Sequence, residues 1–148
     1  MPIMISGDWE KPKRAKRNNL EDQYQEAVFQ WAALNEAREP RLKFMFAVPN
    51  GGLRNITVAM KLKRQGVKSG VPDICLPCPI LSLGTVDFCG LYLEMKAGKN
   101  KPSDEQMKWI DFLRAQGYRV IICWSAEVAI MGIEAYLGMV PKDRDGRP

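Results

Sequence analysis

Two short stretches, Val71-Pro72-Asp73 and Leu91-Tyr92-Leu93-Glu94-Met95-Lys96, decide the fold of this chain of 148 residues. The first places an Asp at the start of an apolar strand, and the second places Glu-x-Lys within one. Side chains two apart on a strand share a face, so Glu94 and Lys96 lie together, opposite the two leucines. Two carboxylates can hold a divalent cation that activates water, and a nearby lysine can offset charge on a phosphate. The pattern indicates a metal-dependent phosphodiesterase; a solvated face with a cross-strand ion pair is the alternative.

Length and composition indicate one globular domain with a real core, since 46% of the residues are hydrophobic and 26% are charged. No run approaches the roughly 20 apolar residues of a membrane span. Residues 1–9 lack the charged head and apolar core of a signal peptide. We therefore expect a cytoplasmic protein with no membrane partner. The chain has no His, which excludes any mechanism built on a histidine base or ligand.

The net charge of +5 is unevenly placed, because residues 11–17 contain five Lys or Arg. Two interpretations are open for this segment. It can contact phosphates and steer an anionic partner, or it can be a solvated, disordered leader. We expect a basic, flexible arm over residues 1–18, a single domain over 19–140 and a polar tail over 141–148.

The four cysteines include Cys75 and Cys78, which have the spacing of half a zinc site. Cys89 and Cys123 do not form a second close pair, and Cys75 and Cys123 lie in apolar, strand-like runs. We therefore expect buried, reduced thiols rather than a zinc site, and no disulfides in a cytoplasmic chain.

The periodicity of apolar residues predicts the element order α-β-α-β-β-α-β-α. The predicted helices cover 19–36, 55–65, 103–117 and a last segment after Ser125, and the predicted strands cover 44–48, 73–78, 90–96 and 118–124. We expect the second and third strands to form an antiparallel pair joined by a long loop at 79–89. Ser103 and Gln106 fit a capping box. A mixed α/β fold with a central sheet flanked by helices follows.

Further polar residues surround the candidate site. Glu21 and Gln25 share one face of the first helix, although the helix macrodipole alone also favours a Glu there. Asn50-Gly51-Gly52 with Arg54 could let the backbone approach a phosphate, or could be a plain tight turn. Lys61, Lys63, Arg64 and Lys68 precede the Asp, and Lys99 and Lys101 follow Lys96, as a nucleic-acid cleft requires. Residues 66–69 do not match a nucleotide-binding P-loop, so we expect no nucleotide cofactor.

The ordered set of motifs also resembles a known family. The motifs are Pro49-Asn50-Gly51-Gly52, Leu62-Lys63-x-x-Gly66, Gly70-Val71-Pro72-Asp73, Glu94-Met95-Lys96, Ser103-x-x-Gln106 and Gly117-Tyr118. Together, from about Glu21 to Trp124, they resemble the VRR-NUC (virus-type replication-repair nuclease) domain, a branch of the PD-(D/E)xK nuclease superfamily. The resemblance implies a restriction-endonuclease-like core.

The resemblance also implies roles at the matching positions. Asp73, Glu94 and the Met95 carbonyl would bind Mg²⁺ or Mn²⁺, Glu21 would reach the same site, and Lys96 would be the catalytic lysine. Gln25 and Gln106 match further site positions. For nucleic-acid contacts we expect the set Asn50, Gly51, Gly52, Arg54, Lys63, Lys68 and Lys99.

The function implied is a metal-dependent DNA endonuclease that hydrolyses phosphodiester bonds in branched DNA, including four-way (Holliday) junctions, in replication, recombination or repair. Stand-alone members of the family resemble this chain in size, are typically encoded by bacteriophages or prophages, and act as homodimers in the bacterial host cell. Two alternatives are open: a non-catalytic module on a nuclease fold that binds structured DNA, and a restriction-type endonuclease that cuts specific duplex sequences.

Overall fold

A four-stranded mixed sheet organises the molecule in the computed structural model, which describes residues 14–49 and 55–139, with side chains from Leu20 onward. The strands lie in the order β1-β2-β5-β6. Their bounds are β1 (Phe46–Ala47), β2 (Ile74–Leu76), β5 (Leu91–Met95) and β6 (Arg119–Cys123). β2 is antiparallel to β1 and to β5, whereas β6 is parallel to β5. The predicted antiparallel pair is confirmed.

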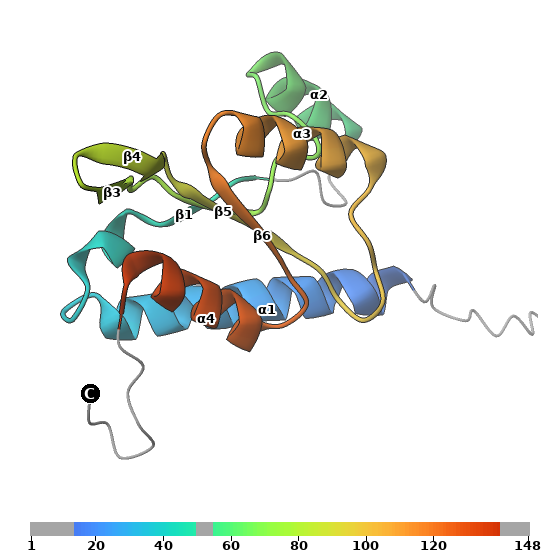
Figure 1. Cartoon of the computed structure of the whole chain (residues 1–148). Coiled ribbons are helices and arrows are strands. Elements are labelled where there is room, and N and C mark those ends of the chain that lie inside the picture. The colour runs from blue at the N-terminus through green and yellow to red at the C-terminus, as the bar shows by residue number, and fades with distance from the viewer. Residues whose placement is uncertain (1–13, 50–54, 140–148) are drawn as a thin grey trace, which may run out of the picture.

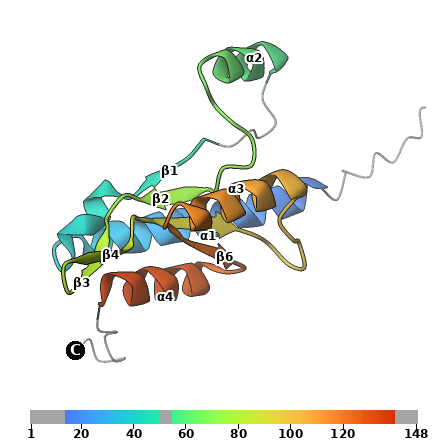
Figure 2. The ribbon, with the colours of Figure 1, turned by 45° about the horizontal axis from the view of Figure 1, so that its top comes forward.

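Helices cover both faces of this sheet, which confirms the predicted α/β class. They are α1 (Arg14–Asn35), α2 (Ile56–Arg64), α3 (Asp104–Ala115) and α4 (Ala126–Leu137). Figure 1 shows α1 and α4 side by side under one face, with α3 over the other. In Figure 2, α2 stands clear of the sheet.

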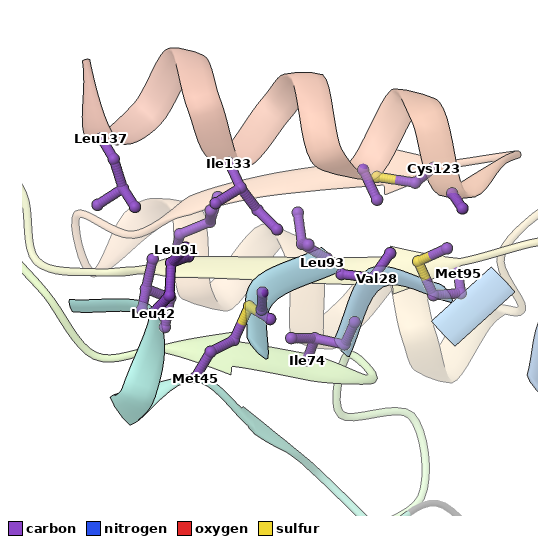
Figure 3. Close-up of a cluster of buried hydrophobic side chains, with 14 residues drawn as sticks. Val28, Leu42, Met45, Ile74, Leu91, Leu93, Met95, Cys123, Ile133 and Leu137 are labelled. Atoms are coloured by element: carbon purple, nitrogen blue, oxygen red, sulfur yellow. The ribbon is translucent and has the colours of Figure 1, made fainter. Parts of the chain in front are cut away.

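The main hydrophobic core lies between the sheet and the α1–α4 pair, as Figure 3 shows. Leu91, Leu93 and Met95 of β5 point into it, and each is 1% exposed. A smaller cluster on the other face packs α3 against β6 around Ile110 and Val120. Because alternate β5 residues fill the main core, the residues between them face α3. That geometry places the polar residues of β5 on the α3 side.

Two serine caps set where the last two helices begin. The Ser103 hydroxyl accepts a hydrogen bond from the Gln106 N–H at 3.2 Å, and the Gln106 side chain accepts one from the Ser103 N–H at 2.8 Å. This reciprocal pair is the predicted capping box. Ser125 caps α4 by accepting from the Val128 N–H at 3.2 Å. Gly117, at φ +88°, follows α3 in a backbone conformation that glycine adopts without strain.

The structure differs from the sequence prediction at the start of the domain. α1 begins at Arg14 rather than Asn19, so residues 14–18 of the expected arm are helical. Residues 1–13 of that arm and 140–148 of the expected tail lie outside the described residues. The predicted strand 44–48 is shorter in the structure, because Phe44 ends a 3-10 helix, η1 (Pro40–Phe44), and only Phe46–Ala47 form strand β1. The Glu39 carboxylate caps η1 by accepting from the Arg41 N–H at 3.2 Å.

The expected loop 79–89 is instead a hairpin of β3 (Ile80–Ser82) and β4 (Thr85–Phe88). Its turn is Leu83-Gly84, with φ of 50° and 82°. A tight hairpin turn of this hand needs positive φ at both central residues, which Asn-Gly usually supplies. Leu at the first position gave no such signal, so the prediction of a loop was wrong.

All four cysteines are free thiols. Cys75 and Cys123 are buried, as expected, and Cys78 is partly buried. Cys89 is exposed, so the expectation of burial was wrong there. It follows the hairpin, and its thiol donates to the Gln116 main-chain oxygen at 3.5 Å. Within the described ranges, the structure has no helix with the length and apolar character of a membrane span.

Candidate active site

Glu94 and Lys96 form a buried ion pair at the end of β5. The Lys96 Nζ lies 2.8 Å from the Glu94 Oε1, and the two residues are 6% and 1% exposed. Removing two charges from water costs several kcal/mol per ion, and only close pairing and further hydrogen bonds offset that cost. The two residues share a face of the strand, as predicted. Their burial argues against an ordinary solvated strand face.

Gln106 of α3 also binds the Glu94 carboxylate. Its Nε2 donates to the Glu94 Oε1 at 2.6 Å. The Gln106 amide oxygen is already used in the capping box, where it accepts from the Ser103 N–H. The amide nitrogen is thereby turned toward the strand. The helix cap and the site therefore share one side chain, and the Ser103–Gln106 motif serves both.

The second oxygen of Glu94, Oε2, is buried and has no hydrogen-bond partner. The pKa of Glu94 is raised to about 7, with burial as the largest cause; the negative charge of Asp73 also raises it, and Lys96 acts in the opposite direction. Burying a carboxylate oxygen without a hydrogen-bond partner costs free energy, because the oxygen loses its contacts with water. A positively charged ligand is the partner that such an oxygen suits.

Asp73 is held beside the same stretch of β5. Its Oδ2 accepts a hydrogen bond from the Met95 N–H at 2.7 Å, and its main-chain oxygen accepts one from the Val48 N–H at 2.8 Å. β1 and β5 thus both position this Asp, which lies just before β2. The structure brings Asp73, Glu94 and Met95 together, as the sequence pattern requires.

Glu21 reaches the same end of β5 from α1. Its Oε1 accepts a hydrogen bond from the Ala97 N–H at 3.1 Å, and its charge also raises the pKa of Glu94. Gln25, one turn further along α1, lines a separate hollow with Phe29 and Ala47. The role of Ala97 could not be predicted from sequence, because only its main-chain N–H takes part.

The donor set at this site fits one divalent cation. Among residues 14–49 and 55–139, no three or more Asp, Glu or Cys side chains gather closely enough to form a metal site by themselves. Asp73 and Glu94 nevertheless supply two neighbouring carboxylates, and hard cations such as Mg²⁺ prefer oxygen ligands and keep several waters. The unpaired Glu94 Oε2 is the atom that most directly suits such an ion.

The predicted nucleic-acid contacts are only partly described. Asn50, Gly51, Gly52 and Arg54 lie outside the described residues. Lys63, on α2, is exposed, as are Lys68 before Asp73 and Lys99 after Lys96. Exposed lysines that precede and follow the buried pair along the chain suit a polyanionic partner.

This fold and site define a class, a nuclease-type α/β domain with an acidic, lysine-bearing centre at the end of its central strands. The sequence model of the VRR-NUC domain family matches residues 7–127, and the chain belongs to this family, whose domain acts on DNA. A solved structure described as "VRR_NUC domain protein" is similar, with 25% sequence identity and a TM-score of 0.63 over 83% of this chain and 92% of that one. No curated protein matches the chain.

Proposed function

We propose that the protein is a metal-dependent DNA endonuclease that cuts phosphodiester bonds in branched DNA such as four-way junctions. The observation that carries this proposal is the buried Glu94, whose Oε1 is bound by Lys96 and Gln106 while its Oε2 stays unpaired. A buried carboxylate held this firmly with one oxygen free is suited to binding a cation rather than to supporting the fold.

The proposed roles combine these contacts with the family resemblance. Asp73, Glu94 and the Met95 carbonyl would hold Mg²⁺ or Mn²⁺, with Glu21 as a further acid nearby. When bound, the ion lowers the pKa of a coordinated water and stabilises charge on the phosphate. Lys96 donates to the Glu94 carboxylate, and its ammonium offsets charge that develops on the phosphate or orients the attacking water.

Two other residues position this machinery. Gln106 fixes the Glu94 carboxylate by its hydrogen bond of 2.6 Å. Glu21 binds the N–H of the residue after Lys96 and so fixes the end of the strand. Gln25 remains a predicted site residue without a described contact to Glu94.

The finer parts of the proposal rest on the family resemblance. They are the preference for branched DNA, a homodimeric assembly, a role in phage or prophage replication, recombination or repair, and action in the bacterial cytoplasm. A dimer would carry two active sites and could nick both sides of a junction. Light scattering on the purified protein tests the assembly, and a monomer mass at micromolar concentration would contradict it.

The decisive experiment compares labelled four-way junction and plain duplex DNA in Mn²⁺. Glu94→Gln removes the charge while keeping the shape, and Glu127→Gln, an exposed Glu on α4, is the matched control. We expect the wild type and the control variant to cut the junction and Glu94→Gln to be inactive. Cutting by Glu94→Gln at the wild-type rate would overturn the site.

The same assay separates the alternatives. Tight junction binding without turnover in any metal would favour a non-catalytic module. Equal cutting of junction and duplex would keep the nuclease and remove the structural preference, and sequence-specific duplex cutting would favour the restriction-type enzyme.

A further inference from the structure

Helix α2 (Ile56–Arg64) leaves three of its large apolar side chains exposed. It has no buried residue, and Ile56, Val58 and Met60 are 76%, 45% and 56% exposed. A surface helix of a globular protein normally buries an apolar stripe against the core. In Figures 1 and 2, α2 projects from the body of the domain instead. Its apolar side chains are therefore available to a partner.

Ile56 and Met60 form the part of this surface most suited to insertion. They lie four residues apart, so they stand one above the other on the same face of the helix. The Ile56 side chain ends in a single methyl group, and the Met60 side chain is unbranched and flexible, so both can enter a narrow space between bases. Side chains of this kind enter between base steps in proteins that deform DNA.

The charge around this face identifies the kind of partner. Residues 55–72 include Lys61, Lys63, Arg64 and Lys68 and no Asp or Glu, and three of these cations lie in the last turn of α2. A second copy of this helix would bring the same cations and be repelled. A nucleic acid supplies phosphates for the cations and base faces for the apolar residues.

The base of α2 is tied to the helix that supports the site. The Ser69 hydroxyl donates to the Glu105 Oε2 at 2.8 Å. Gly70, at φ +84°, packs so closely on α3 that a Cβ there would lie 3.0 Å from the Glu105 main chain. The neighbouring residue Gln106 holds Glu94, so α2 projects from a segment fixed beside the active centre.

We propose that α2 recognises the branch point of DNA, with Ile56 and Met60 packing against unstacked bases while its cations hold the flanking phosphates. This inference rests on the proposed function and names the surface that selects the substrate. An intact duplex keeps its bases stacked and offers α2 only phosphates. Affinity for any DNA then comes from the cations, and preference for a branch comes from the apolar pair.

The test is a binding experiment in EDTA, which does not depend on cleavage. The probes are a four-way junction and a duplex, each with 2-aminopurine at the equivalent central position, since its fluorescence rises when the base unstacks. The variant is Ile56→Ala/Met60→Ala, which keeps every charge and favours the helix. The control is Leu81→Ala/Leu83→Ala in the β3–β4 hairpin, where the leucines are 63% and 106% exposed.

We expect the α2 variant to bind the junction about tenfold more weakly and to lose the 2-aminopurine signal. Its affinity for duplex should stay within about twofold of the wild type. The control variant should match the wild type on both DNAs. Equal losses on both DNAs, an unchanged junction affinity, or a signal absent from the wild type would overturn the proposal. So would a change of oligomeric mass in the α2 variant, because α2 would then be an interface between copies. A wild type that unstacks the junction but never cuts it would refute the endonuclease and retain the recognition surface.

Discussion

The protonation of Glu94 makes the metal-free protein sensitive to pH. Its pKa is about 7 in the folded protein and 4.5 in an unconstrained chain. Below pH 4.5 the carboxyl is protonated in both states and contributes nothing. As the pH rises from 4.5 to 7, the unfolded chain ionises first and the native state binds more protons, so stability falls. The loss is complete above pH 7.

The magnitude follows from the two pKa values. Raising a carboxyl pKa from 4.5 to about 7 corresponds to about 3 kcal/mol of stability lost across this pH range. Glu94 is 1% exposed, so solvent screening reduces this figure little. Glu94→Gln cannot ionise and lacks this contribution, although it also leaves Lys96 without its anionic partner. The pH dependence of the difference between the two proteins is therefore the quantity to measure.

The assay is urea unfolding of wild type and Glu94→Gln in EDTA at several pH values between 4 and 8. We expect the stability of the wild type, relative to the variant, to fall by about 3 kcal/mol over this interval. Excess Mg²⁺ should reverse much of the fall in the wild type alone, since a ligand that binds only the native state stabilises it. A relative stability that stays flat or rises with pH would refute the reasoning about the unpaired carboxylate.

Three further predictions concern single side chains. Gln106→Ala should lower single-turnover junction cleavage by about tenfold to a hundredfold, because it frees the Glu94 carboxylate; an unchanged rate would remove Gln106 from the site. Gly70→Ala should destabilise the protein by about 1–3 kcal/mol in urea unfolding, because a Cβ at φ +84° would lie 3.0 Å from the Glu105 main chain; a neutral result would show that this segment relaxes. Ser125→Ala should cost about 1 kcal/mol by the same measurement, whereas Ser125→Asn should restore the cap of α4.

The sequence predicted the sheet and its polar centre because both depend on short-range patterns. Alternation along residues 91–96 assigned Glu94 and Lys96 to one face, and that face is the one turned toward α3. Capping by Ser103 and Ser125 was predictable because it depends on residues three apart. The pattern could not predict the burial of Glu94 and Lys96. The same alternation is compatible with a solvated face, and burial depends on α3 covering the strand.

The features that were missed depend on backbone conformation or on distant partners. η1 buries Leu42 and takes in Phe44, the first residue of the predicted strand, and its cap depends on the backbone conformation of Glu39. The β3–β4 hairpin turns at Leu83, a residue without turn preference. The contact of Glu21 with Ala97 could not be predicted from residue types, because the donor is a main-chain N–H. Long-range contacts of this kind appear only when the fold is known.

The hydrogen bond between Glu21 and Ala97 joins positions 76 residues apart in the chain. During synthesis, α1 leaves the ribosome long before β5 and α3 exist, and Glu94 gains its Gln106 partner only after both have emerged. A truncated or half-folded product therefore carries Asp73 and the basic α2 without the assembled candidate site. Late assembly would therefore confine the proposed phosphodiester cleavage to the finished domain.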